Sequence, residues 1–315
     1  MMTATPATPR IPGTESAFLG TRGVTLHVVE AGRGPLVILL HGFPEFSWSW
    51  RHQLPALAAA GFRAVAVDLR GHGLSARPRG VAAYGVARLA ADVDDVIDAL
   101  GVERAAAVVG HDWGGVVAYR FAARYPQRLD RLVILNAAHP AALARGLLRN
   151  AQALRSAYVL PIMLPALPER ALAALDGALL RATLRAFRAT NVRDDELEPY
   201  VEMARRAEWL RGGLDQYRAM GRAIGRAVLS RVPIVGPLFA RVSPPLGSPR
   251  ARRIDTPALV IWGEEDPFLA RHLAEPPRSL VPNVRVERVT GASHDVMLDA
   301  PERVNALLLD FLRNP

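Results

Sequence analysis

The sequence predicts an α/β protein in which a mostly parallel central sheet is flanked by helices and interrupted by one helical insertion. Short, continuous apolar runs alternate with longer segments of helical periodicity, which is typical of parallel strands buried on both faces. The alternation stops over residues 141–255, where alanine, leucine and arginine recur at helical spacing and several prolines intervene. Because the alternation then resumes, we expect this stretch to be a helical cap inserted into the core domain.

The chain is long enough for one large core and an inserted subdomain, since half of its 315 residues are apolar. It contains no cysteine, which excludes disulfides, thiolate metal sites and a thiol nucleophile. This composition suits a reducing cytoplasm. Residues 1–16 are polar and proline-bearing, so we expect a flexible tail rather than a signal peptide.

The formal charge of +9 does not by itself predict a nucleic-acid-binding protein. All 39 basic residues are arginines, they are spread along the chain, and acidic residues lie among them, whereas a nucleic-acid binder concentrates its cations. We therefore expect no nucleic-acid partner. No apolar stretch approaches the roughly 18 residues of a membrane span, so we expect no stable membrane insertion.

The first part of the core is predicted over residues 17–140. Leu36–Leu40 is an uninterrupted apolar run, and Ala64–Asp68 alternates alanine with valine, so both are expected to be buried strands. Val86–Leu100 carries apolar residues at helical spacing and ends at a glycine, which predicts a helix.

The next strand–helix–strand unit contains the most informative turn. Ala105–Val109 is predicted to be a strand that runs into Gly110, and Trp113–Tyr125 is predicted to be a helix that stops near Pro126. Leu132–Asn136 is expected to be the following strand.

Two segments remain, namely the last part of the cap and the second part of the core. Within the cap, Arg231–Arg253 is too rich in proline and glycine for one long helix, so a lid loop or linker is favoured over a membrane-surface or partner-binding element. The core resumes over residues 256–315. Its expected elements are the strands Ala258–Trp262 and Val284–Val289 and a closing helix from about Pro301.

Asp112 occupies the position of a nucleophile in a sharp strand–turn–helix motif. Gly110-His111-Asp112-Trp113-Gly114 matches the pattern G-x-S-x-G with aspartate in place of serine. The glycines permit the turn, and the helix N-terminus favours a carboxylate there. Taken alone, Asp112 is also compatible with an ordinary helix N-cap.

Two further residues follow strands in the chain order of α/β hydrolases, which is nucleophile, acid, then histidine. Asp266 follows Ala258–Trp262, and His294 follows Val284–Val289. Together with Asp112 they form a candidate triad and predict the α/β-hydrolase fold. We expect the neighbouring carboxylates, Glu265 and Asp295, to be solvated.

The loop after Leu36–Leu40 is expected to provide an oxyanion hole. In His41-Gly42-Phe43-Pro44, the backbone N–H of Phe43 would join that of Trp113 as a second donor. His41 and His72 are interpreted as structural, and His111 as a packing or supporting residue.

An aspartate nucleophile indicates displacement at a saturated carbon rather than direct acyl transfer. Aspartate is ionised at neutral pH and needs no base for this first step. The product would be an alkyl ester on Asp112, which His294, oriented by Asp266, would then hydrolyse by activating water. A carbon–oxygen bond in an epoxide or a carbon–halogen bond fits this scheme.

Four segments resemble the epoxide hydrolase family of α/β hydrolases, and the resemblance covers nearly the whole chain. In that family two cap tyrosines donate hydrogen bonds to the epoxide oxygen. The resemblance implies this role for Tyr158, in Ser156-Ala157-Tyr158, and for Tyr217, in Asp215-Gln216-Tyr217-Arg218. The remaining tyrosines are interpreted as structural. The segments are HGFPEFSWSWRHQLPAL, DLRGHGLSARP, VVGHDWGGVVAYRFAARYPQRLDRLVILN and WGEEDPFL.

The sequence predicts a cofactor-independent epoxide hydrolase with no metal, acting on a small lipophilic epoxide in a pocket that includes Trp48 and Pro44. Two alternatives stay open. A dehalogenase would use the same nucleophile, although Phe43 stands where haloalkane dehalogenases often carry a second halide donor. A non-catalytic ligand-binding protein of the same fold would not need the triad. The sequence also leaves open whether the chain forms a homodimer.

Overall fold

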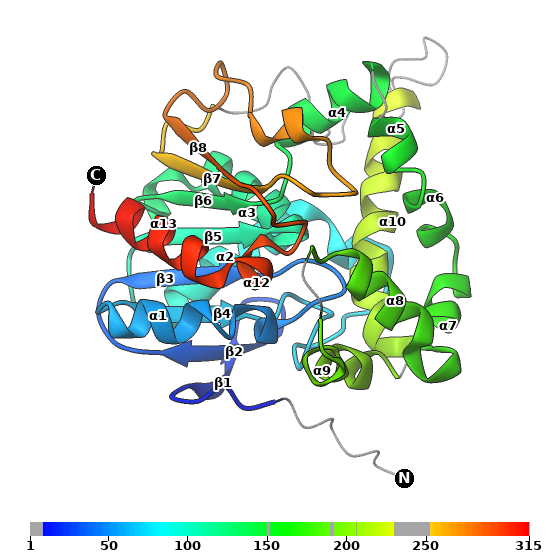
Figure 1. The fold of residues 1–315 in the computed structure, drawn as a ribbon, viewed down its shortest axis with the longest axis horizontal. Helices are drawn as coiled ribbons and strands as arrows, with labels where there is room; N and C mark the ends of the chain where they lie inside the picture. The colour runs from blue at the N-terminus through cyan, green and yellow to red at the C-terminus, as the bar shows by residue number, and fades with distance from the viewer. Residues whose placement is uncertain (1–8, 150–151, 190–191, 206, 230–252, 315) are drawn as a thin grey trace.

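The computed structural model describes residues 9–149, 152–189, 192–205, 207–229 and 253–314. Within these residues eight strands form one sheet, in the order β1-β2-β4-β3-β5-β6-β7-β8 (Figure 1). The pairs β1–β2 and β2–β4 are antiparallel and the others are parallel, so the predicted mostly parallel sheet is confirmed. The strands are β1 (Glu15–Gly20), β2 (Thr25–Ala31), β3 (Leu36–Leu40), β4 (Arg63–Val67), β5 (Ala107–His111), β6 (Leu132–Leu135), β7 (Ala258–Gly263) and β8 (Val284–Val289).

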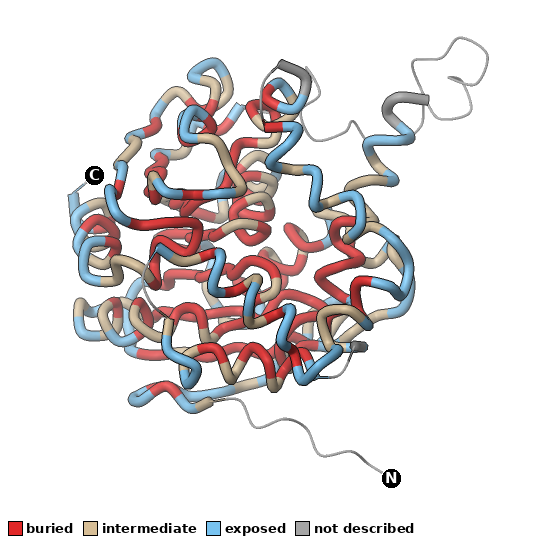
Figure 2. The backbone as a smooth tube through the Cα atoms, turned by 45° about the vertical axis from the view of Figure 1, so that its right-hand side comes forward, coloured by how far each residue is buried: buried red, intermediate tan, exposed pale blue. Residues whose placement is uncertain are grey.

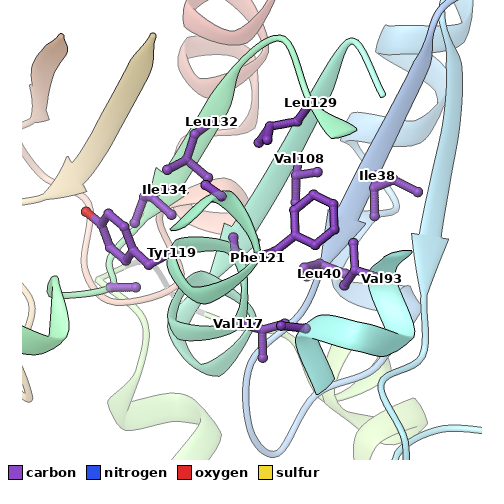
Figure 3. Packing of buried hydrophobic residues seen from close by; sticks show 14 of the residues in the cluster. Ile38, Leu40, Val93, Val108, Val117, Tyr119, Phe121, Leu129, Leu132 and Ile134 are labelled. Carbon is purple, nitrogen blue, oxygen red and sulfur yellow. The ribbon is translucent and has the colours of Figure 1, made fainter. Parts of the chain in front are cut away.

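Helices cover both faces of this sheet, which explains why β3, β5, β6 and β7 are buried at every position. On one face α2 and α3 pack through residues such as Val93 and Phe121 (Figure 3). On the other face α1, α12 and α13 pack through Leu57 and Leu308. The core helices are α1 (Gln53–Ala59), α2 (Val86–Ala99), α3 (Asp112–Arg124), α12 (Val296–Asp299) and α13 (Pro301–Arg313), with 3-10 turns η1 (Ser47–Trp50), η2 (Val81–Tyr84), η3 (Pro126–Arg128) and η5 (Arg271–Ala274).

The predicted helical insertion lies between β6 and β7 and covers the carboxyl edge of the sheet (Figure 1). α10 runs through it, and α5, α6 and α7 lie along the side of α10 that faces away from the sheet. The predicted segment 231–253 lies outside the described residues except at its last position. The cap elements are α4 (Pro140–Arg149), α5 (Gln152–Arg155), α6 (Val159–Ile162), α7 (Leu167–Ala173), η4 (Leu175–Gly177), α8 (Ala178–Ala186), α9 (Asp194–Ala204) and α10 (Ala207–Leu229).

The largest differences between the observed and the predicted elements lie in two places. β5 covers Ala107–His111 rather than Ala105–Val109, because Ala105 only bridges Leu129 and the strand continues through Gly110. β1 begins at Glu15, inside the predicted tail, and with β2 forms an antiparallel edge that the sequence analysis did not identify. In the described part of the chain, no helix combines the length and the apolar character that a bilayer crossing requires.

Candidate active site

The turn between β5 and α3 holds Asp112 in a conformation that few side chains adopt. Its φ is +45°, a left-handed value that costs a non-glycine residue about 1–3 kcal/mol. A Cβ on Gly110 would lie 2.7 Å from the Gly115 nitrogen, and one on Gly114 would lie 2.7 Å from the His41 carbonyl oxygen. The glycines are therefore required by close backbone approach, and the turn presents Asp112 at the N-terminus of α3, where the helix dipole favours an anion.

The loop after β3 faces this carboxylate. The Phe43 N–H donates a hydrogen bond to Asp112 Oδ2 over 3.0 Å. A Cβ on Gly42 would lie 2.7 Å from the same oxygen, so only glycine permits this approach. That the backbone N–H of Trp113 is the second donor of the oxyanion hole stays a prediction.

Asp112, Asp266 and His294 meet at the carboxyl edge of the sheet, as the chain order predicts. His294 Nδ1 lies 2.7 Å from Asp266 Oδ2, and His294 Nε2 lies 3.9 Å from Asp112 Oδ1. Asp266 Oδ1 accepts the backbone N–H groups of Phe268 and Leu269. The imidazole is thus oriented with one nitrogen on a fixed carboxylate and the other toward the candidate nucleophile.

The charges around His294 set its protonation state. Burial alone lowers the pKa of an imidazole, but the charge and hydrogen bond of Asp266, with the charge of Asp112, raise the pKa of His294 to about 10. Burial also opposes ionisation of Asp266, yet His294 keeps the pKa of that carboxyl below its usual value. Before any reaction, the buried pair at neutral pH is an imidazolium and a carboxylate.

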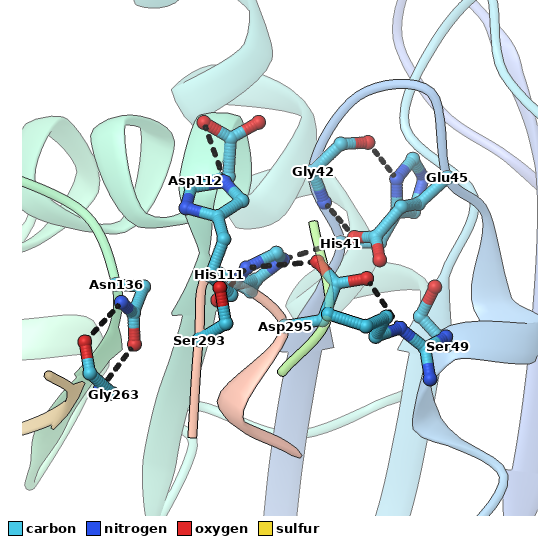
Figure 4. Close-up of polar contacts among 12 residues, drawn as sticks. His41, Gly42, Glu45, Ser49, His111, Asp112, Asn136, Gly263, Ser293 and Asp295 are labelled. Atoms are coloured by element: carbon cyan, nitrogen blue, oxygen red, sulfur yellow. Dashed lines mark hydrogen bonds and ion pairs between the residues drawn. The ribbon is translucent and has the colours of Figure 1, made fainter. Parts of the chain in front are cut away.

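Asn136, which the sequence analysis did not single out, braces Asp266. Its Nδ2 donates to Asp266 Oδ2 over 2.8 Å. Its Oδ1 accepts the Gly263 N–H over 2.8 Å (Figure 4). Asn136 directly follows β6 and has a φ of +36°. A polar residue at the end of an apolar strand, on the same sheet edge as Asp112, was the available signal.

His111 and Glu45 form a buried ion pair beneath the nucleophile (Figure 4). His111 Nδ1 lies 2.9 Å from Glu45 Oε2, and its Nε2 lies 3.0 Å from the carbonyl oxygen of His294. Because both neighbours are acceptors, both ring nitrogens carry protons. Burial opposes this charge, but Glu45 raises the pKa of His111, and His111 in turn lowers the pKa of buried Glu45 to about 2.

The expectation for Asp295 was wrong, whereas that for Glu265 is confirmed. The Asp295 side chain is 1% exposed and pairs with Arg188 of the cap, with Nε 2.8 Å from Oδ2. Burial raises the pKa of Asp295 to about 6. Glu265 is half exposed. The partner of Asp295 lies more than one hundred residues away in sequence, so no local pattern predicted its burial.

The two cap tyrosines lie over the candidate nucleophile. Tyr217, on α10, packs edge-on against Trp113 and Phe43, with ring centroids 4.9 and 5.7 Å apart. Tyr158 precedes α6 and packs edge-on against Phe268, with ring centroids 5.4 Å apart. Burial, together with the charge of Asp112, raises the pKa of both phenols, so both keep their protons at neutral pH and can donate.

Aromatic side chains line the histidine side of the site. Phe187 from the cap and Phe268 from the loop after β7 pack edge-on against His294, at 5.5 and 5.3 Å between centroids. Neither was singled out from the sequence. Of the two predicted pocket residues, Trp48 packs on the cap–core cluster with Phe43, and Pro44 follows Phe43 through a cis peptide. Their contact with a substrate stays a prediction.

One set of side chains has metal-like spacing. Ligand atoms of His111, His294 and Asp295 lie within 4.8 Å of one another. Each residue already has a partner in the described structure, namely Glu45, Asp266 and Arg188 respectively. Protonation of His111 at both nitrogens also disfavours a metal there.

Known proteins match this chain over nearly its whole length. The family model described as alpha/beta hydrolase fold matches residues 35–301. The chain is 35% identical to the AB hydrolase superfamily protein YfhM of Bacillus subtilis, over 96% of this chain and 99% of that protein. It is 33% identical to mouse epoxide hydrolase 4, over 92% of this chain and 77% of that protein. A crystal structure of Bacillus megaterium epoxide hydrolase with an inhibitor superimposes with a TM-score of 0.79 at 28% identity, covering 95% of this chain and 100% of that one.

Proposed function

We propose, from the premise that this chain belongs to the epoxide hydrolase family of the α/β hydrolases, that it converts an epoxide to a vicinal diol through an ester on Asp112. The observation that carries the proposal is the placement of a carboxylate, rather than a serine, opposite His294 Nε2 and next to Trp113, against which the cap residue Tyr217 packs. The charge of this carboxylate helps to raise the pKa of both cap tyrosines. A serine hydrolase would need neither phenol, because its leaving group forms by collapse of a tetrahedral acyl intermediate.

In the first step, an oxygen of Asp112 attacks an epoxide carbon and the ring carbon–oxygen bond breaks. The electron pair of that bond goes to the ring oxygen, which takes a proton from Tyr158 or Tyr217. Phenols whose pKa is raised hold their protons until this alkoxide develops, which is what an acid catalyst must do here. The hydrogen bond from the Phe43 N–H holds the other carboxylate oxygen in place.

In the second step, His294 removes a proton from water as the water oxygen attacks the ester carbonyl. Esterification removes the charge of Asp112, which is one cause of the raised pKa of His294. The neutral imidazole required for base catalysis is therefore favoured only after the ester has formed. The proton that His294 gives up before this step restores the tyrosine that lost its proton in the first step. Asp266 stabilises the imidazolium that forms when His294 then takes the proton of the attacking water. Collapse of the tetrahedral intermediate breaks the bond to the substrate oxygen, which takes the proton of the added hydroxyl, so the diol leaves and the Asp112 carboxylate is restored.

A single turnover in heavy-oxygen water tests this route. The water oxygen attacks the ester carbonyl, so the label is expected in the Asp112 carboxylate, detected by peptide mass analysis. A label found only in the diol would exclude the covalent route. The Asp112→Asn variant serves as the control, since it should form neither diol nor ester.

Product analysis separates the two rival activities. The dehalogenase alternative would release halide from small haloalkanes or haloacids, measured beside diol formation under the same conditions. The Tyr217 ring packs edge-on against Trp113, with centroids 4.9 Å apart, so a phenol occupies the space beside the indole, which supports the epoxide. A protein that forms no adduct with any epoxide and releases no halide would be a ligand-binding member of the family.

A further inference from the structure

Two long stretches of the sequence contain no acidic residue, and the fold brings them together. The first runs over residues 131–168 and the second over residues 216–254. Their described cap portions form α4, α5 and α6 on one side and the second half of α10 on the other. α6 packs on α10 where Met163 meets Gly221. We call the surface formed by residues 143–147, 152–167 and 219–226 the acid-free face.

Two carboxylates border the described cap portions of these stretches, and both are paired inside the cap. Glu169 and Asp215 are both buried and both pair with Arg218, at 2.7 and 2.9 Å. The acid-free face therefore receives no exposed negative charge from either border.

This face exposes large apolar side chains that the cap does not cover. Leu154 and Leu160 are 81% and 71% exposed, and the outer side of the cap is largely exposed in Figure 2. Exposed apolar residues that lie together on one surface indicate an interaction site, whereas single exposed apolar residues scattered over a protein do not. The others on this face are Leu147, Leu164, Leu167 and Ile224.

Exposed arginines lie among these leucines. Within the described residues, no carboxylate forms an ion pair with Arg145, Arg222 or Arg226. Arg155 differs from them, because its Nη1 donates to the carbonyl oxygens of Asp266 and Pro267. An arginine can extend its aliphatic stem along an apolar surface while its guanidinium reaches a phosphate. Leucines that enter the acyl region and arginines that remain at headgroup level are the pattern of a monotopic lipid-binding surface.

We propose that the acid-free face binds the surface of an anionic lipid bilayer, without crossing it. A nucleic acid would bind the arginines but not the exposed leucines, because its phosphate backbone is charged. An acidic protein surface would likewise bind the arginines, but it has no apolar layer into which the leucines could insert, whereas a bilayer has one. Tyr158 lies between Leu154 and Leu160 and is itself 39% exposed. The acid-free face therefore borders the candidate active site. Binding of lipid to this face does not depend on the proposed chemistry.

Vesicle flotation with the full-length protein tests the proposal. The unmodified chain should float with vesicles of equal parts phosphatidylcholine and phosphatidylglycerol, bind pure phosphatidylcholine far less, and be released by high salt. The double variant Leu154→Glu/Leu160→Glu should lose binding about tenfold or more, because it removes apolar contact and adds charge facing anionic headgroups.

A matched control carries the same change elsewhere. The variant Phe18→Glu/Leu175→Glu also replaces two exposed apolar residues, 59% and 87% exposed, but outside the acid-free face. It should bind vesicles almost as the unmodified chain does, and both variants should keep its thermal midpoint. Equal binding by both variants, or no preference for phosphatidylglycerol, would overturn the proposal. So would light scattering that showed a dimer broken by Leu154→Glu/Leu160→Glu, since the face would then be an interface between copies.

Discussion

Arg188 of the cap donates a hydrogen bond through Nε to Asp295 Oδ2 over 2.8 Å, and Asp295 directly follows His294 in the chain. Both side chains are almost fully buried, at 3% and 1% exposure. The cap is thus fixed to the core one residue from the candidate base.

Replacing Arg188 with methionine should leave the Asp295 carboxylate buried without its cation. Removing one partner of a buried ion pair typically costs about 3–5 kcal/mol, so the unfolding free energy at pH 7.5 should fall by that order in denaturant titrations. The pKa of Asp295, already raised to about 6 by burial, should rise further. Stability of the variant should therefore recover as the pH falls through that pKa and the carboxyl becomes neutral.

The double variant Arg188→Met/Asp295→Asn controls for packing. It removes both charges, so its stability should be nearer that of the unmodified chain and should lack the recovery at low pH. Equal losses in the single and double variants would show that the ion pair itself contributes nothing.

His294→Gln should separate the two steps of the proposed reaction. The first step needs no base, so the ester should form, while its hydrolysis should slow by about 10²–10⁴-fold. Intact-protein mass spectrometry should then show a stable mass increase equal to the mass of the epoxide. The adduct should be absent from Asp112→Asn, and a failure to accumulate it would remove His294 from the hydrolytic step.

The raised pKa of His294 should make stability depend on pH. The folded pKa, about 10, lies above the ordinary imidazole value of 6.5. The stabilisation from the charged imidazole is therefore fully present below pH 6.5 and is lost as the pH rises toward 10. The difference in unfolding free energy between the unmodified chain and His294→Gln should shrink over that window. A constant difference would mean that His294 is neutral in the folded chain.

Tyr158→Phe and Tyr217→Phe should each slow ester formation without slowing its hydrolysis. Loss of one hydrogen bond to the developing alkoxide should lower the single-turnover alkylation rate by about 10–100-fold. Tyr200→Phe is the matched control, since the Tyr200 hydroxyl bonds Ser49 Oγ away from the reacting groups. The quench-flow rate for Tyr200→Phe should stay unchanged, and equal effects of all three variants would indicate a structural role.

Gly213→Ala should disturb the contact between α10 and the loop after β3. A Cβ at position 213 would overlap the Phe43 ring and lie 2.8 Å from His72 Cε1, and overpacking of this kind costs about 1–3 kcal/mol. Both the thermal midpoint and kcat/KM should fall, because Phe43 supplies the N–H bound to Asp112. The control is Gly225→Ala on the same helix, where an added Cβ would meet no atom within 4 Å outside the neighbouring helix backbone. This variant should keep its activity and be slightly more stable. A loss of activity in both variants would point to a general weakening of α10.

Sequence patterns were sufficient for features that are local in the chain. The strand Val284–Val289 has the predicted bounds, and Asp112, Asp266 and His294 lie at the strand ends where the chain order put them. β1 and β2 were missed because neither presents one apolar run: β1 is exposed or half-buried at every position, and β2 is mostly buried but includes His27 and Glu30 among its apolar residues.

The polar residues around the candidate triad depend on contacts between distant segments. Arg188 reaches Asp295 from the cap, and Glu45 reaches His111 from the loop after β3. Burial of such a charge is decided by its partner, and no period in the local sequence encodes that partner. Tyr158 and Tyr217 were assigned by resemblance because their helices carry no chemical signal of their own.

The cap leaves the core after β6 and returns at β7, and these strands are neighbours, with Leu135 paired to Ile261. Both ends of the insertion are therefore fixed to adjacent strands, one after Leu135 and the other before Ala258, and the entropy of closing an insertion varies only weakly with its length. One cap can therefore be replaced by another at this junction without a change in the register of the strands. The position of the Asp112 carboxylate would then also stay unchanged. The carboxylate and the imidazole are therefore inherited with the core, whereas each new cap must supply its own donors in place of Tyr158 and Tyr217.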